Sequence, residues 1–120
     1  MIKRYNMGGR YSEATVYNGV AYLCGQCCNE GNEREKDIKV QTKETLENID
    51  RVLADIGIDK SKILMATIYL KDIAYYDEMN EIWDSWIVKD KYPARACVEA
   101  KLAEKDLLVE IVVTAAIETK

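Results

Sequence analysis

The sequence predicts a single α+β domain whose strands and helices follow the order β-β-α-β-α-β-β. Two observations support this class: apolar residues alternate with a period of two near both ends of the chain, and they recur with helical spacing in its middle. The chain has 120 residues, enough for one domain with one core, so we expect residues 1–120 to form a single unit. Two amphipathic helices can cover one face of a sheet, and we therefore expect a mixed sheet with one open face.

A turn signal predicts the first two strands. Asn18-Gly19 separates residues 11–17 from residues 20–24, and both central residues of a type I′ turn need a positive φ, which asparagine and glycine tolerate. Residues 25–32 are rich in turn-forming and small side chains. We therefore expect an antiparallel hairpin that leads into a loop.

Two amphipathic helices with a strand between them occupy the middle of the chain. The first begins at Asp37 and ends before Gly57, a natural helix terminator, and the second follows Asp72, which can cap it. Between them, residues 63–70 form an apolar, partly β-branched run that is too short for an ordinary helix, which favours a buried strand. Their apolar stripes comprise Ile38, Leu46, Ile49, Val52, Leu53 and Ile56 in the first helix, and Tyr76, Met79, Ile82, Trp83, Trp86 and Ile87 in the second.

Two extended segments, residues 92–100 and 107–116, end the domain. Pro93, the only proline, stops the preceding helical pattern and starts the first segment. The period of two places Arg95 and Cys97 on one face of that segment. In the second segment the Glu110 face also carries Val112, Thr114 and Ala116, opposite a row of valine and isoleucine. We expect Val112, Ala116 and Cys97 on the open face, where self-association would cover them.

The composition argues against several classes of protein. No run approaches the roughly 18 apolar residues of a membrane span, and residues 1–6 lack the apolar core of a signal peptide, so we expect a cytoplasmic protein. The formal net charge is −4 and lysine and arginine form no cluster, which argues against nucleic acid as the main partner.

The chain contains no histidine, which excludes histidine-based hydrolases and nucleases of the ribonuclease A type. A zinc site would need all four cysteines or a carboxylate, yet Cys97 lies far in sequence from Cys24, Cys27 and Cys28. We therefore expect no metal site and free thiols.

Near the C-terminus stand the segments Pro93-Ala94-Arg95-Ala96-Cys97-Val98-Glu99 and Leu108-Val109-Glu110-Ile111. Together they resemble the C-terminal signature of the YjgF/RidA family, the reactive intermediate deaminases, also described as L-PSP-like endoribonucleases or RutC-like proteins. Gly9-Arg10-Tyr11 and Cys24-Gly25-Gln26 stand where the family has Gly-Pro-Tyr and Ser-Gly-Gln. The short loop after Gln26 and the helix around Trp83-Asp84-Ser85-Trp86 are similar to the YoaB-like branch. The resemblance covers nearly the whole chain and implies a chorismate-mutase-like YjgF fold that assembles as a homotrimer with ligand clefts between subunits.

The resemblance also implies an activity, a 2-iminobutanoate/2-iminopropanoate-type deaminase. Such a hydrolase converts enamines and imines like 2-aminoacrylate into 2-oxo acids and ammonia and needs no cofactor. The planar fork of Arg95 matches the substrate carboxylate, and Glu110 can exchange protons with the attacking water. The other implied substrate-binding residues are Tyr11 as a wall and donor, Gly25 as a backbone contact, Asn80 as a support and Cys97 through its main chain.

Plainer interpretations stand beside these. Arg95 and Glu110 could form a cross-strand ion pair, Cys97 could be a small buried hydrophobe, and Tyr11 could be an edge-strand aromatic. Arg95 could also serve a non-catalytic protein that binds or senses small carboxylates such as 2-oxo acids. An endoribonuclease or translation-inhibitor activity finds little support in an acidic chain without histidine.

Overall fold

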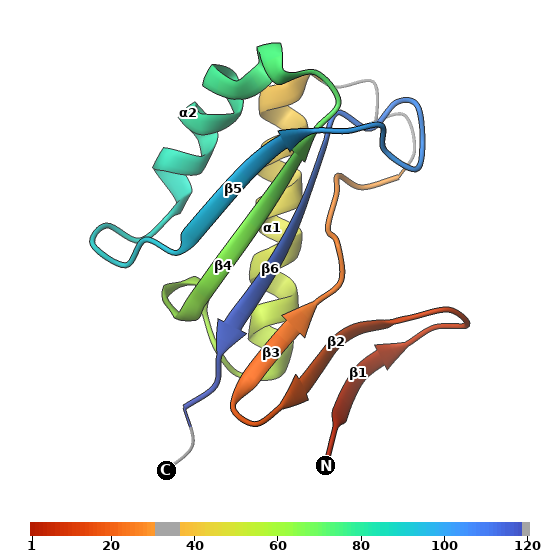
Figure 1. Ribbon diagram of the computed structural model, residues 1–120, viewed down its shortest axis with the longest axis vertical. Coiled ribbons are helices and arrows are strands. Elements are labelled where there is room, and N and C mark those ends of the chain that lie inside the picture. Colours follow the sequence, from red (N-terminus) through yellow and green to blue (C-terminus); the bar gives the residue numbers. More distant parts are fainter. Residues whose placement is uncertain (31–36, 119–120) are drawn as a thin grey trace.

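Six strands and two α-helices make up the computed structural model, which describes residues 1–30 and 37–118 (Figure 1). In chain order they are β1 (Lys3–Met7), β2 (Ser12–Tyr17), β3 (Val20–Leu23), α1 (Ile38–Ile56), β4 (Ile63–Leu70), α2 (Tyr76–Trp86), β5 (Ala94–Glu99) and β6 (Val109–Ala116). The α+β class and both helices are confirmed. Residues 31 and 32 of the predicted loop lie outside the described part of the chain.

The strands form one mixed sheet in the order β1-β2-β3-β6-β4-β5. β4 and β5 run parallel, and the other neighbouring pairs are antiparallel. A parallel pair needs a crossover, and α2 supplies it between β4 and β5. The hairpin prediction is confirmed as well, because Asn18 and Gly19 have φ values of 49° and 77° between β2 and β3.

The edge strand β1 was missing from the predicted order. Its side chains are mostly polar and exposed, so the strand has no alternation that would reveal it. Pairing with β2, as in Tyr5 opposite Ala14, holds it in the sheet, and Tyr5 packs against the core. Tertiary pairing therefore decides the conformation of this segment.

Helix α1 has a clear signal at each end. The Asp37 side chain accepts a hydrogen bond from the Val40 amide at 2.9 Å and so caps the first turn. Gly57 ends the helix in the left-handed conformation, with φ 93°, and its amide donates to the Leu53 carbonyl. Asp72 caps the short 3-10 turn Ile73–Tyr75 that leads into α2, by accepting from the Ala74 amide.

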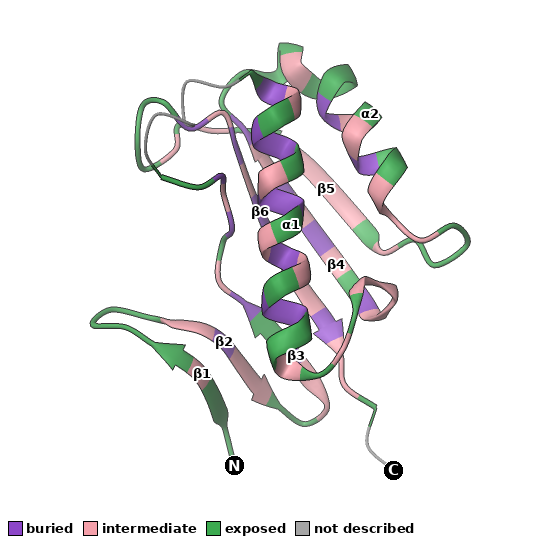
Figure 2. Cartoon of the chain, turned by 180° about the vertical axis from the view of Figure 1, so that it is seen from behind, coloured by how far each residue is buried: buried purple, intermediate pink, exposed green. Residues whose placement is uncertain are grey.

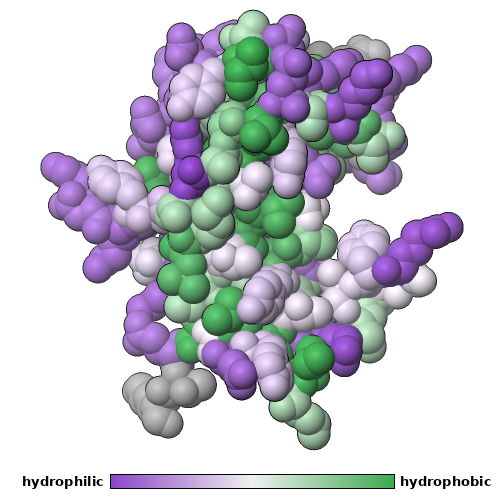
Figure 3. All heavy atoms as spheres, in the orientation of Figure 1, coloured by the Kyte–Doolittle hydropathy of each residue, from purple (hydrophilic) through white to green (hydrophobic). Residues whose placement is uncertain are grey.

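Both helices lie on one face of the sheet (Figure 2). The side chains beneath them are fully buried, among them Ala66, Ile68 and Leu70 of β4 and Ile111 and Val113 of β6. The opposite face of β6, which carries Glu110 and Val112, is half-exposed. Figure 3 shows apolar side chains gathered over the central strands of this open face.

The placement of Cys97 on the open face was wrong. Cys97 lies opposite Ile68 in the parallel β4–β5 pair, and Arg95 lies opposite Ala66, so both side chains point toward the helices. Val112 and Ala116 are on the open face as predicted.

Candidate functional site

Arg95 reaches from β5 to the underside of α2, where neutral groups hold it. Its Nη1 donates to Asn80 Oδ1 at 2.7 Å, and its Nη2 donates to the Tyr76 hydroxyl at 3.1 Å. The guanidinium carbon lies 5.3 Å from the Trp83 ring centroid and 5.8 Å from that of Tyr76, within the range of a cation–π contact. The arginine is therefore fixed in orientation by an amide, a phenol and two aromatic rings.

No carboxylate within residues 1–30 and 37–118 forms an ion pair with Arg95. The guanidinium also keeps N–H donors beyond the two that bind Asn80 and Tyr76. A partly buried arginine in this state is suited to bind a planar anion such as a carboxylate.

Helical spacing explains how α2 builds this support. Tyr76, Asn80 and Trp83 are separated by four and three residues, so they share one face of the helix. The sequence prediction named Asn80 but treated the aromatic residues as structural. Their spacing from Asn80 was the signal that could have linked Tyr76 and Trp83 to Arg95.

Cys97 lies two residues beyond Arg95 on the same face of β5 and packs against the core. Burial raises the pKa of its thiol above the ordinary value, although the Arg95 charge acts in the opposite direction. Burial therefore favours the thiol over the nucleophilic thiolate.

A second group of predicted residues lies on the open face, around Glu110. A Cβ atom at Gly25 would lie 2.1 Å from Glu110 Oε2, so a side chain at residue 25 would displace the carboxylate. Gln26 and Ile111 exchange two backbone hydrogen bonds of 2.9 Å, and this bridge keeps Gly25 beside Glu110. In the described part of the chain, no lysine or arginine forms an ion pair with Glu110.

Tyr11 is 64% exposed and lines a cavity of about 280 Å³ that Gly25 also lines. Arg51 and Glu13 lie in the same wall, joined by hydrogen bonds of 3.0 and 3.3 Å. These bonds hold the pKa of the Glu13 carboxyl below its ordinary value. Cys24 lines the cavity too, and burial raises the pKa of its thiol.

One subunit does not bring the two groups together. Arg95, Asn80 and Cys97 lie on the helix-covered side, whereas Glu110 lies opposite Tyr69 on the open side. β4 also separates β5 from β6 in the sheet. The alternative of a cross-strand ion pair between Arg95 and Glu110 is therefore wrong for a single chain.

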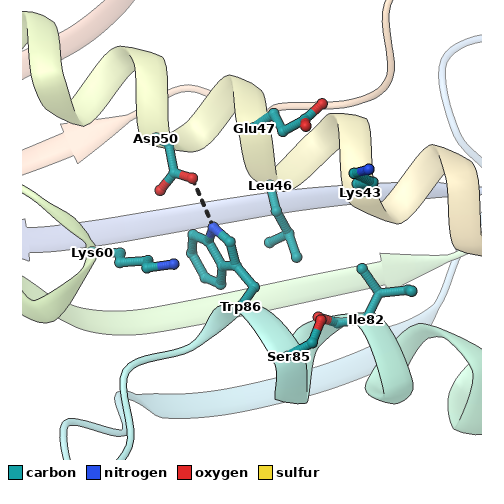
Figure 4. Close-up of a pocket in the computed structure, with 8 residues that line it drawn as sticks. All are labelled: Lys43, Leu46, Glu47, Asp50, Lys60, Ile82, Ser85 and Trp86. Carbon is teal, nitrogen blue, oxygen red and sulfur yellow. Dashed lines mark hydrogen bonds between the residues drawn. The ribbon is translucent and has the colours of Figure 1, made fainter.

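A groove of about 450 Å³ lies between α1 and α2 and is an alternative candidate for the functional site (Figure 4). Two of its charged residues contact Trp86: Trp86 Nε1 donates to Asp50 Oδ2 at 2.9 Å, and Lys60 Nζ lies 5.0 Å from the Trp86 ring centroid. The remaining lining residues are Lys43, Leu46, Glu47, Ile82 and Ser85. The groove contains none of the predicted site residues, so we place the candidate site at Arg95 and Glu110.

The described residues offer neither a metal-binding cluster nor a membrane-spanning helix. They contain no cluster of three or more cysteine, aspartate or glutamate side chains that could hold a metal ion. None of their helices has the length and apolar character needed to cross a membrane.

Known proteins are similar to this chain over nearly its whole length. The profile of the family described as Endoribonuclease L-PSP matches residues 1–117. A RutC family protein of Haemophilus ducreyi is 47% identical over 117 residues, which cover 98% of this chain and 97% of the relative. The RutC family protein YoaB of Escherichia coli is 37% identical, with 97% of this chain and 98% of the relative covered.

The solved structures extend the similarity to the fold. A member of the YjgF protein family from Neisseria meningitidis superposes with a TM-score of 0.90 at 42% identity, covering 100% of this chain and 98% of that one. An uncharacterised protein from Pseudomonas aeruginosa gives a TM-score of 0.92 at 34% identity, with 98% and 100% covered.

Proposed function

The chain belongs to the Endoribonuclease L-PSP family, which includes RutC and YjgF proteins, and from this premise we propose that it is a deaminase of enamines and imines derived from amino acids. Its substrates resemble 2-aminoacrylate, its products are a 2-oxo acid and ammonia, and it acts in the cytoplasm. The observation that carries the proposal is the oriented, uncompensated charge of Arg95 beneath α2.

The two charged residues divide the reaction between them. Arg95 binds the substrate carboxylate, which keeps its charge throughout, and Asn80 holds the guanidinium. Glu110 accepts a proton from water as the water oxygen bonds to the imine carbon, and the imine nitrogen gains a proton. The hydroxyl proton of the resulting carbinolamine then passes to its nitrogen, the C–N bond breaks with its electron pair going to nitrogen, and ammonia leaves as the 2-oxo acid forms.

The reaction requires two copies of the chain, because Arg95 and Glu110 lie on opposite faces of one sheet. We propose a homotrimer with ligand clefts between subunits. In each cleft, Arg95, Asn80 and Cys97 of one subunit face Tyr11, Gly25 and Glu110 of the next. The apolar open face supports this arrangement, since association would remove it from water (Figure 3).

An assay of ammonia release, with the imines generated in situ in the reaction mixture, tests the proposal. We expect the wild type to accelerate release, and Arg95→Ala to lose substrate binding by roughly 2 to 5 kcal/mol, because a desolvated carboxylate would lose its charged partner. Lys39→Ala is the matched control: it also removes a cation that contacts α2, through Glu81 at 2.9 Å on the outer surface. Imine decay at the uncatalysed rate with several substrates would refute the proposal.

Binding without turnover would instead identify a non-catalytic carboxylate-binding protein. Titration with 2-oxo acids on the same preparations separates this alternative from the deaminase. RNA cleavage, which the family description names, is a weak alternative for a chain with a net charge of −4 and no histidine. A cleavage activity that disappears in Arg95→Ala would revive it.

A further inference from the structure

Tyr76 has an unused hydrogen-bond donor beside the Arg95 guanidinium. Its hydroxyl oxygen accepts from Arg95 Nη2 at 3.1 Å, so its own hydrogen must point elsewhere. Within residues 1–30 and 37–118, no group accepts that hydrogen. The side chain is 39% exposed, which leaves the hydroxyl open to a ligand.

We propose that Tyr76 is a substrate-binding residue whose hydroxyl donates to the same carboxylate that Arg95 binds. This inference rests on the proposed function, since it assigns a second contact to the same anion. A carboxylate oxygen placed against Arg95 Nη2 lies beside the Tyr76 hydroxyl, because those two groups are in contact. A carboxylate has lone pairs enough for both donors.

The pairing of a guanidinium with a phenol also determines selectivity. Arg95 and Tyr76 both donate hydrogen bonds to the ligand. An amide ligand also carries N–H donors, and these would face the donors of the protein with no acceptor between them. The site should therefore prefer 2-oxo acids to their amides. The Tyr76 ring would keep its cation–π contact with Arg95 in a phenylalanine variant, so the hydroxyl can be tested by itself.

Calorimetric titration with pyruvate and 2-oxobutyrate tests the hydroxyl. We expect Tyr76→Phe to weaken binding about 10-fold, the size of one hydrogen bond to a charged group. Tyr75→Phe is the matched control, because this adjacent tyrosine packs against the core. It should bind within about twofold of the wild type, and pyruvamide should bind poorly to all three proteins.

Proton NMR provides a second readout that a purely structural role of Tyr76 would not change. We expect a slowly exchanging hydroxyl signal when 2-oxobutyrate is added to the wild type and Tyr75→Phe, and no such signal in Tyr76→Phe. Unchanged affinity in Tyr76→Phe, or weaker affinity without the wild-type hydroxyl signal, would overturn the inference while leaving the proposed function intact. Absence of binding by all three proteins would instead reject the carboxylate-binding function, and the role of Tyr76 with it.

Discussion

Arg95 and Glu110 are chemically complementary, yet each lacks an oppositely charged partner within the described part of one chain. Arg95 is held by Asn80 and by aromatic side chains of α2, and Glu110 has room because residue 25 is glycine. Charged side chains that have no ion-pair partner but are held in one orientation are characteristic of ligand sites. An ordinary surface charge adds little to stability when it is fixed in this way. The roles of the two residues can be separated by mutation.

Glu110→Gln should separate binding from rate. Glutamine keeps the shape and hydrogen bonding of Glu110 but cannot accept a proton, so we expect near wild-type affinity for pyruvate and turnover about 10²- to 10⁴-fold slower. Calorimetry and the ammonia-release assay on the same preparation measure both quantities. Full turnover in this variant would show that Glu110 has no catalytic role.

The ion pair between Glu13 and Arg51 joins β2 to α1, and Asn6 of β1 also donates to Glu13. The Arg51 hydrogen bond lowers the pKa of Glu13 from its ordinary value of 4.5, so the charged form of Glu13 stabilises the folded state. That contribution is present above the unfolded pKa and is lost as the pH falls through the lower folded pKa.

Glu13→Gln should therefore reduce the free energy of unfolding at pH 7 by less than about 1 kcal/mol, since Arg51 is half-exposed. The difference from the wild type should shrink as the pH falls below 4.5. Urea unfolding at several pH values measures it. A difference that stays constant down to strongly acidic pH would contradict the role of the charged pair.

The C-terminal cap of α1 offers a second test. Gly57 has φ 93°, a conformation that costs a residue with a Cβ atom free energy, so Gly57→Ala should destabilise the protein by about 1 kcal/mol. Thermal unfolding measures the loss. Ala54→Gly is a contrasting variant. It places glycine inside the helix, where the conformational freedom of glycine lowers the stability of the helix. Equal stability of Gly57→Ala and the wild type would rule out this account of the helix end.

In the proposed trimer, association would complete the site. Val112 lies next to Thr67 on the open face, where the proposed association would cover it. Val112→Asp should therefore yield a monomer and abolish turnover, since burying an unpaired charge opposes association. Val40→Asp is the control, because Val40 is 37% exposed on α1, on the helix-covered side. Light scattering measures the mass, and a wild-type monomer at micromolar concentration would contradict the trimer.

Much of this molecule follows from local sequence. Asn18-Gly19 predicts the hairpin turn, Asp37 and Gly57 bound α1, and the period of two assigns the two faces of β6 correctly. Each of these features depends on backbone preference or side-chain periodicity within a short segment. They could therefore be predicted, whereas the roles of Arg95 and Glu110 stay predictions.

The order of the strands and the face of the sheet on which β5 places Arg95 and Cys97 were decided by tertiary structure. β5 and β6 follow each other in the sequence, but the α2 crossover places β5 beside β4, on the side away from β6. The polar strand β1 likewise forms only because β2 offers it an edge. Backbone pairing and helix packing set these positions, and both depend on contacts between distant segments rather than on local pattern. Arg95 and Glu110 therefore lie on opposite faces of the sheet, although their types and spacing were plain in the sequence.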